Sequence, residues 1–150
     1  LKIKISKDKF YEICKQYENN KSIYFLQKYN QEKATKKIYS YNHSFFNAIS
    51  HTKKFKNEFS NLVFLELINK FDDIYYLDNI DFYIPSKNIA IVPIPFFNTF
   101  LTGNLVKKII KSAQELNINE INIISISNNE KISDPKLKIN VIPFYEWALS

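Results

Sequence analysis

The sequence predicts an α/β fold, in which helices flank a mixed β-sheet. One observation is a strongly helical segment, 55–71, followed later by a second helical segment, 103–117, each with an apolar face. Another is a set of short runs with strand-like composition that follow these helices. The runs cover residues 74–78, 80–84, 88–94, 120–127 and 138–142. The third run is apolar on both faces, which is typical of a central, buried strand.

Composition is typical of an ordinary soluble single domain. The chain has 150 residues, of which 45% are hydrophobic and 24% charged. One glycine and five prolines exclude collagen-like and flexible low-complexity chains. The longest nearly apolar stretch, 89–97, falls well short of the roughly 18–20 residues of a transmembrane helix, and no signal-peptide pattern is visible. The single cysteine, Cys14, favours a reducing compartment, so we expect a cytoplasmic protein without a membrane segment.

Two residue types are missing altogether. The chain has no methionine, so we expect it to be part of a longer polypeptide. All 21 basic residues are lysine, which excludes an arginine finger and any bidentate arginine contact with phosphate or guanine. The formal net charge of +6 has two interpretations. It is either a solvated lysine surface that reflects an AT-rich codon bias or a surface for an acidic partner such as nucleic acid.

The first 54 residues are expected to form an N-terminal segment made of a helix, a hairpin and a short second helix. Ser6 is a suitable helix N-cap, and apolar residues recur at helical spacing up to Asn19. Cys14 lies on the apolar side of this helix, where we expect a small buried side chain. Two strands, 22–29 and 36–41, flank a polar bridge and predict a hairpin. A short helix is expected to follow from residue 43 to about residue 50.

Residues 55–150 are expected to form the α/β core. The first core helix has a wide apolar face, made of Phe55, Phe59, Leu62, Val63, Leu65 and Leu67. For the second helix, 103–117, Thr102 is the expected N-cap. The crossover through this helix should place the strand 120–127 parallel to the strand 88–94.

The chain ends with a short predicted helix. Pro143 is suited to open it, because proline is tolerated in a first helical turn. Trp147 lies within this helix, and we expect it to anchor the helix in the core.

Six short segments, in their order and spacing, resemble a known family. They are KIYSYNH (37–43), FNA (46–48), NLVFLEL (61–67), IYY (74–76), IDF (80–82) and VIPFYEW (141–147). Over roughly residues 22–149 the chain resembles the C-terminal domain of bacterial and archaeal AAA-type ATPases. In that family a P-loop ATPase domain and a winged helix precede this domain, so residues 1–21 are interpreted as the tail of the winged-helix region.

The C-terminal domain of that family resembles the restriction-endonuclease-like, PD-(D/E)xK fold, and the resemblance implies this fold for the core. In active members carboxylates hold a divalent metal and a lysine assists the attacking water. By resemblance, Asp81 matches the aspartate of the first strand. Ser60 stands where a glutamate of the preceding helix is expected, and Val92 and Ile94 stand where the acid and the lysine of the third strand are expected. We therefore predict that the nuclease chemistry is lost and that Asp81 is a vestige of it.

Other candidate sites are weaker. Four aspartates lie within ten residues, but the spacing lacks the central glycine and terminal glutamate of an EF-hand, and we interpret them as turn and strand-edge residues. These are Asp72, Asp73, Asp78 and Asp81. His43 and His51 are eight residues apart and lack a third ligand, so no metal site is predicted.

A nucleotide site within this chain is not predicted. Gly103 is the only glycine, whereas a P-loop needs two glycines and a Gly-Lys-Ser/Thr sequence. We expect no cofactor in this chain, and ATP and Mg²⁺ only in the upstream ATPase domain that the resemblance implies.

Two groups of lysines are candidates for contacts with nucleic acid. With lysine alone, such binding would be non-specific or shape-driven and would weaken steeply with salt. The candidates are Lys53, Lys54, Lys56, Lys107, Lys108 and Lys111.

Three hypotheses for the function stay open. The first is a non-catalytic accessory domain of an AAA-type ATPase, which contacts the upstream ATPase domain and binds DNA or a protein partner. The second is a divergent metal-dependent nuclease that uses Asp81 with relocated carboxylates such as Glu66 or Asp78. The third is a structural oligomerisation module, with exposed aromatic side chains at the interface between copies.

Overall fold

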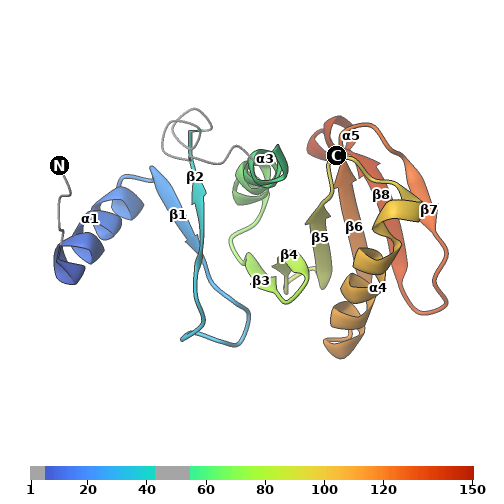
Figure 1. Cartoon of the computed structure of the whole chain (residues 1–150), viewed down its shortest axis with the longest axis horizontal. Helices are drawn as coiled ribbons and strands as arrows, with labels where there is room; N and C mark the ends of the chain where they lie inside the picture. The colour runs from blue at the N-terminus through green and yellow to red at the C-terminus, as the bar shows by residue number, and fades with distance from the viewer. Residues whose placement is uncertain (1–5, 43–54) are drawn as a thin grey trace.

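The chain is an α/β protein in which helices flank a mixed sheet. The computed structural model describes residues 6–42 and 55–150 (Figure 1). The main sheet has six strands in the order β3-β4-β5-β6-β8-β7. Their bounds are Tyr75–Leu77 (β3), Ile80–Ile84 (β4), Ile89–Pro93 (β5), Glu120–Ser125 (β6), Glu130–Ile132 (β7) and Lys138–Pro143 (β8). The predicted α/β class with a mixed sheet is confirmed.

Helices and a separate hairpin complete the described part of the chain. The two-stranded sheet consists of β1 and β2, which run antiparallel, as predicted for a hairpin. The bounds are Lys7–Asn19 (α1), Ile23–Leu26 (β1), Lys37–Ser40 (β2), Phe55–Lys70 (α3), Thr99–Glu115 (α4) and Phe144–Ala148 (α5). The helix predicted for residues 43–50 lies outside the described residues. No helix among the described residues is long and apolar enough to cross a membrane.

The strand directions follow from the connections between strands. β5 pairs with β6, and β6 with β8, in parallel, while the other three pairs of the sheet are antiparallel. Helix α4 is the crossover between β5 and β6, so the predicted parallel pairing of these strands is confirmed. The strand β5 lies in the middle of the sheet and is buried from its second residue onward, as its apolar sequence predicted.

Side chains alternate along each strand, so the buried residues form two hydrophobic cores, one on each face of the main sheet. In β6, Ile121 and Ile123 pack beneath α4, while Ile124 packs with α3 and α5 on the other face. In β5, Val92 belongs to the α4 side and Ile91 to the α3 side. The sheet is therefore covered by α4 on one face and by α3 and α5 on the other, with α4 in front of the sheet in Figure 1.

The hairpin is attached to both the core and the main sheet. Leu26 and Tyr39 are buried in the same cluster as the apolar residues of α3. Just after β1, the backbone N–H of Tyr29 donates to the carbonyl of Tyr76, and the N–H of Tyr76 donates to Gln27, both at 3.0 Å. The chain after β1 therefore pairs with the edge strand β3.

The C-terminal helix is fixed by a lysine of α3. Trp147 is buried on the α3 side, as predicted for an anchor. The ammonium of Lys70 donates to the carbonyls of Trp147, Ala148 and Ser150 at 3.0–3.3 Å. A cation at these carbonyls satisfies acceptors that the end of a helix leaves free.

Helix α4 starts earlier than predicted. Its N-cap is Asn98, whose side chain accepts hydrogen bonds from the N–H groups of Phe100 and Leu101 at 3.0 and 3.2 Å. Thr102, the predicted N-cap, lies in the first turn and donates its hydroxyl to the Asn98 carbonyl. The prediction was wrong because Asn98 is an equally good cap and Gly103 is tolerated inside the helix.

Some smaller predictions were also wrong. The strand β7 was not predicted, because three residues, two of them charged, carry no alternating pattern. On α3, Phe55 and Leu62 are 48% and 41% exposed, although they were assigned to its apolar face. Helix α1 begins after the predicted cap, Ser6, but contains no buried residue, and Cys14 is only half-buried.

Candidate functional site

A cavity of about 340 Å³ lies between the hairpin, α3 and β4. It brings together residues from three distant parts of the chain. Strand β2 supplies Lys37, Ile38 and Tyr39, helix α3 supplies Asn57, Ser60 and Asn61, and strand β4 supplies Asp81. Helix α3 contains the segment 61–67 and strand β4 the segment 80–82, while β2 contains the first four residues of the segment 37–43; the family resemblance partly rests on these segments.

The carboxylate of Asp81 is paired with a lysine from the hairpin. The ammonium of Lys37 lies 3.3 Å from Asp81 Oδ1 and also 4.8 Å from the centre of the Tyr76 ring. The side chains of Lys37 and Asp81 are 38% and 23% exposed, so solvent partly screens the pair. The charge of Asp81 is therefore balanced by the protein itself.

Asn61 joins α3 to the outer edge of the hairpin. Its Oδ1 accepts from the backbone N–H of Ser40, and its Nδ2 donates to the Ser40 carbonyl, each at 2.8 Å. Asn61 is 2% exposed, so these groups have no access to bulk water. The side-chain amide thus acts as a short piece of neighbouring strand and fixes one wall of the cavity.

Tyr39 forms the floor of the cavity. Its ring stacks on Phe64 with 4.2 Å between the ring centres. Burial raises the pKa of the Tyr39 hydroxyl well above its usual value, and the negative charge of Asp81 raises it further, while a hydrogen bond with Ser60 acts in the opposite direction. The hydroxyl is therefore a neutral polar group at physiological pH.

The residues expected from the nuclease-like resemblance are only partly brought together. Ser60 and Asp81 line the same cavity. Val92 and Ile94 are instead buried in the cluster beneath α4, on the other face of the sheet.

The carboxylates proposed for a divergent nuclease have partners of their own. Glu66 lies 3.6 Å from the ammonium of Lys70, one helical turn along α3. Asp78 accepts from Lys28 at 2.8 Å. Within residues 6–42 and 55–150, no three His, Cys, Asp or Glu side chains are grouped so that they could hold a metal ion.

The remaining aspartates of the acidic cluster, Asp72, Asp73 and Asp78, do not line the cavity. Asp73 accepts hydrogen bonds from the N–H and the hydroxyl of Ser86, at 2.7 and 2.9 Å, which agrees with the interpretation of a turn residue. His43 and His51 lie outside the described residues.

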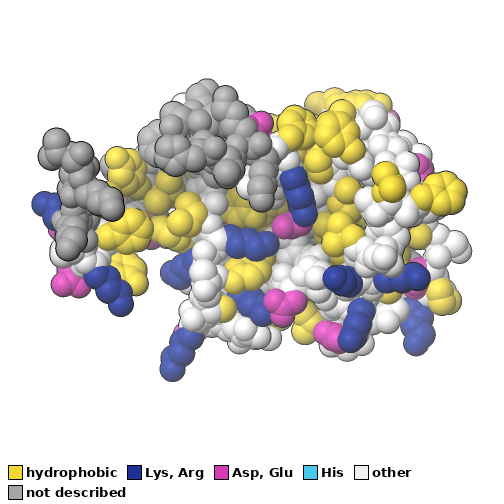
Figure 2. Space-filling model, viewed as in Figure 1, with side chains coloured by type: hydrophobic (Ala, Val, Ile, Leu, Met, Phe, Trp, Pro, Cys, Tyr) yellow, Lys and Arg dark blue, Asp and Glu magenta, His cyan; other side chains and the backbone are white. Residues whose placement is uncertain are grey.

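The lysine candidates do not form one continuous group. Lys107, Lys108 and Lys111 are exposed on the outer side of α4, whereas Lys56 is exposed in the first turn of α3. These helices cover opposite faces of the sheet, and Lys53 and Lys54 lie outside the described part of the chain. Figure 2 shows lysine side chains spread across one face of the molecule, over the hairpin and α4.

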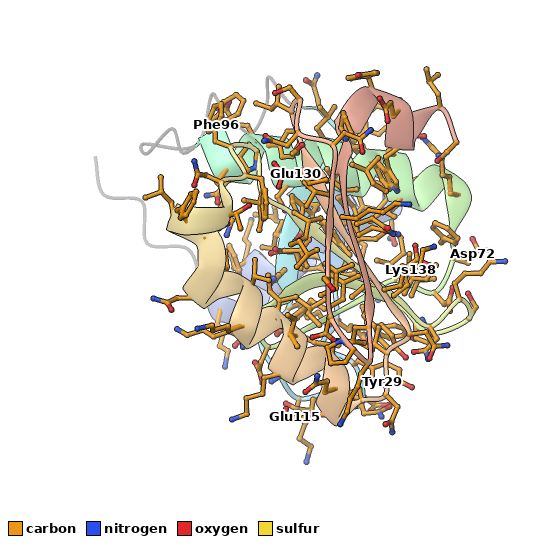
Figure 3. All side chains as sticks on the ribbon, turned by 90° about the vertical axis from the view of Figure 1, so that its right-hand side faces the viewer. Tyr29, Asp72, Phe96, Glu115, Glu130 and Lys138 are labelled. Carbon is orange, nitrogen blue, oxygen red and sulfur yellow. The ribbon has the colours of Figure 1, made fainter. Side chains whose placement is uncertain are left out.

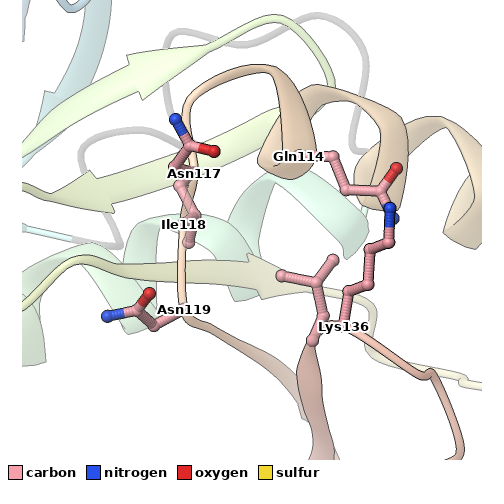
Figure 4. A pocket seen from close by; sticks show the side chains of 6 residues that line it. Gln114, Asn117, Ile118, Asn119 and Lys136 are labelled. Carbon is pink, nitrogen blue, oxygen red and sulfur yellow. The ribbon is translucent and has the colours of Figure 1, made fainter.

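A second cavity, of about 270 Å³, lies at the end of α4 (Figure 4). Three carboxamides and one ammonium line it, together with two aliphatic side chains. The residues are Gln114, Asn117, Ile118, Asn119, Lys136 and Leu137. This lining has no carboxylate, and it offers hydrogen-bond donors and acceptors together with the ammonium of Lys136.

The two ends of α4 differ in their surroundings. Figure 3 shows Phe96 beside the beginning of α3, at the opposite end of the molecule from Tyr29 and Glu115. The Phe96 ring stacks on Phe55, with 5.4 Å between the ring centres. This end of the molecule also exposes Phe100 and Leu101 in the first turn of α4, by 96% and 85%.

Comparison of the chain with protein-family models, curated proteins and solved structures finds no match. The family resemblance therefore rests on the sequence segments quoted above alone.

Sequence reasoning missed most of the cavity lining. Lys37, Tyr39 and Asn61 were quoted only as parts of resembling segments, and Asn57 was not singled out. A lysine in a strand and an asparagine in a helix are ordinary surface residues by pattern alone. The available signal was the polar Asn61 immediately before the apolar run 62–65.

Proposed function

We propose that this chain is a non-catalytic, cytoplasmic accessory domain of an AAA-type ATPase, with a degenerate restriction-endonuclease-like fold that binds a partner. The observation that carries this proposal is the cavity itself. Three segments that resemble the family, separated along the chain, meet there, and the carboxylate of Asp81 faces the ammonium of Lys37.

The chemistry of the cavity supports binding more than hydrolysis. A divalent metal of a nuclease is held by two or more oxygen ligands that are not already neutralised. Here Asp81 has a fixed cation as its partner, Ser60 lies where the family has an acid, and the Asn61 amide is already bonded to Ser40. What is left around the cavity is a set of neutral hydrogen-bonding groups, which suits a polar partner.

The partner is either DNA or protein in this proposal, and the upstream ATPase domain contributes ATP and Mg²⁺. DNA is supported by Lys107, Lys108 and Lys111, which project from four turns of α4 that contain no acidic residue before Glu115. Protein is supported by the exposed Phe100 and Leu101 at the beginning of the same helix.

The experiment that tests the non-catalytic role is incubation of labelled duplex DNA with the protein and Mn²⁺, with Asp81→Ala as the matched control. We expect both proteins to leave the DNA intact. Cleavage by the natural protein that disappears in Asp81→Ala would overturn the proposal in favour of a divergent nuclease. The same samples, titrated without Mn²⁺ at rising salt, measure DNA affinity, and replacing the three α4 lysines by glutamine should weaken it.

The oligomerisation hypothesis draws on the exposed Phe96, Phe100 and Leu101. Sedimentation equilibrium of the natural chain decides it. A mass that rises with concentration, and falls to that of a monomer in Phe100→Ser with Leu101→Ser, would favour an oligomerisation module, and a constant monomer mass would remove it.

A further inference from the structure

A third cavity, of about 290 Å³, lies between the end of α1, strand β1 and the second half of α3. We infer that it binds a small organic cation, a quaternary ammonium compound with an apolar body. The inference goes beyond the proposed function, because this cavity shares no residue with the one that contains Asp81. It stands on the charge, the aromatic rings and the size of the cavity.

Both charged side chains in the lining are acidic. Glu18 comes from the end of α1, and Asp72 follows α3, on the side of the molecule away from α4 (Figure 3). No salt bridge joins either carboxylate to a lysine among residues 6–42 and 55–150. The carboxylate of Asp81 in the first cavity, by contrast, is paired with Lys37. In a chain with a formal net charge of +6, this cavity is therefore a locally negative site.

Aromatic rings form much of the rest of the lining. Tyr24 of β1 and Phe64 of α3 pack edge to face, with 5.6 Å between the ring centres. Phe71 lies two helical turns beyond Phe64, and its N–H still donates to the carbonyl of Leu67 at 2.9 Å, so the rings of Phe64 and Phe71 share one side of α3. The faces of such rings carry negative potential and attract cations.

No lysine lines the cavity. The ammonium of Lys36 lies 5.9 Å from the centre of the Phe25 ring, which also borders the cavity. Phe25 alternates along β1 with Tyr24 and Leu26, which pack towards α3, so this ring and the cation over it lie on the other face of the hairpin. The lysines of α4 cover the opposite face of the main sheet. The two carboxylates are therefore left to a cation from solution.

The other side chains of the lining select the kind of cation. Apart from the carboxylates, the Tyr24 hydroxyl is the one side-chain hydrogen-bonding group in the lining, and the remaining side chains are apolar. A primary ammonium needs acceptors for its three N–H groups, whereas a quaternary ammonium has no N–H to satisfy. Aromatic rings with few acceptors are the surroundings in which quaternary ammonium groups are bound.

Size and net charge favour a small molecule over a basic segment of a protein. The volume of about 290 Å³ is close to the lower end of the range for small-molecule sites, roughly 300–1,000 Å³. A segment with several lysines would be repelled by the net charge of the chain. A single small cation responds mainly to the two adjacent carboxylates, because salt screens charges more than about 10 Å away.

The test is an NMR titration of the isotope-labelled chain with benzyltrimethylammonium as the probe. Benzyl alcohol is the neutral control, and benzenesulfonate is the anionic control. We expect shifts of backbone amides around Tyr24 and Phe71, and a dissociation constant for the cation about tenfold lower than that for benzyl alcohol. Benzenesulfonate should show no saturable binding, and benzylamine should bind severalfold more weakly than the quaternary compound.

Variants of the lining connect the binding to this cavity. Glu18→Gln combined with Asp72→Asn should raise the dissociation constant of the cation about tenfold and leave that of benzyl alcohol unchanged. Both side chains are exposed, so the double variant should fold. Glu12→Gln is the matched control, because Glu12 is an exposed acid of the same helix that does not line the cavity. Phe71→Leu should raise the dissociation constant of the cation severalfold.

Several results would overturn the inference. They are equal affinity for the cation and benzyl alcohol, unchanged binding in the double variant, and shifts that map away from the cavity. Benzylamine that binds as tightly as the probe would exclude a quaternary ammonium ligand. A peptide with trimethyllysine that binds about tenfold more tightly than the probe would show that a protein segment occupies the cavity, and would overturn the small-molecule ligand.

These outcomes are separate from those of the proposed function. Cleavage of DNA that depends on Asp81 would remove the non-catalytic role whatever the cations do. Failure of the cations to bind would leave that role standing, because no residue of the first cavity takes part.

Discussion

The two faces of the main sheet have opposite characters. The cluster beneath α4 is almost wholly aliphatic, with Ile121, Ile123 and Val92 among its fully buried members. The cluster beneath α3 contains aromatic rings, such as Phe64 and Phe82, and it adjoins the polar cavity. Aliphatic side chains fill space but offer no hydrogen bonds, whereas the α3 side borders the polar cavity that Lys37, Asn61 and Asp81 line.

The buried side chain of Asn61 illustrates the difference between the two faces. On the α3 face the buried polar side chain of Asn61 is tolerated because both of its amide atoms are bonded. Burying such an amide costs desolvation free energy, which its hydrogen bonds offset. Those bonds fix the position of the hairpin against α3 in a way that apolar packing alone would not. Changes on the two faces should therefore have different consequences.

The largest effect on stability is expected on the aliphatic face. Ile123→Ala removes a fully buried side chain from β6 and should lower the free energy of unfolding by about 2–5 kcal/mol. Urea unfolding followed by circular dichroism measures it. Leu101→Ala is the control, because its side chain is 85% exposed and the change should be close to zero. A loss below about 1 kcal/mol for Ile123→Ala would contradict the assignment of this face.

A smaller loss is expected from the polar link on the α3 face. Asn61→Leu leaves the N–H and C=O of Ser40 buried and unpaired, which should cost about 2–4 kcal/mol. Asn57→Leu, one turn away on the same helix, has no such bonds and should change the free energy of unfolding by less than about 0.5 kcal/mol. Parallel urea titrations compare the two variants, and equal losses would show that the bonds to Ser40 do not hold the hairpin.

The smallest effect should be confined to alkaline solution. Burial raises the pKa of Tyr39 when the chain is folded, whereas the unfolded chain loses this proton near the ordinary value of about 10. Above that pH the folded state binds more protons than the unfolded state, so stability falls as pH rises, by up to about 1.4 kcal/mol per pH unit. Below about pH 10 the contribution is fully present.

Tyr39→Phe isolates this effect from the titration of the lysines. Thermal unfolding between about pH 9 and 11.5 should show a shallower decline in the variant than in the natural chain. Parallel declines in the two proteins would mean that the Tyr39 hydroxyl titrates normally and is not buried beside Asp81.

Most of the fold follows from local patterns. The helices α1, α3 and α4 and the strands from β1 to β6 are visible as local runs of apolar, helix-forming or strand-forming residues, and the parallel pairing of β5 with β6 follows from the helix between them. The features that were predicted wrongly are those for which several local signals compete or the signal is too short. Asn98 and Thr102 are both capping residues, and the three residues of β7 form a strand only because β8 lies beside them.

Much less of the candidate site was predicted. Asp81 and Ser60 were singled out through the family resemblance, and the structure places both on one cavity. Lys37, Ile38 and Asn57 carry no pattern that marks them, because their roles depend on which elements pack against one another. Val92 and Ile94 were expected at the site, but strand alternation directs them beneath α4.

By itself, the sequence determined the α/β class, the position of most elements and the all-lysine surface, since these depend on residue type and spacing along the chain. Only the tertiary structure decided that Lys37 meets Asp81, 44 residues away, and that Asn61 meets Ser40, 21 residues away. Such pairs form when the packing of apolar faces brings distant polar groups together, and no local periodicity records that meeting. The unpaired backbone groups of Ile38 belong to the same class of feature, because the packing of α3 brings Asn61 to Ser40 but brings no described partner to Ile38.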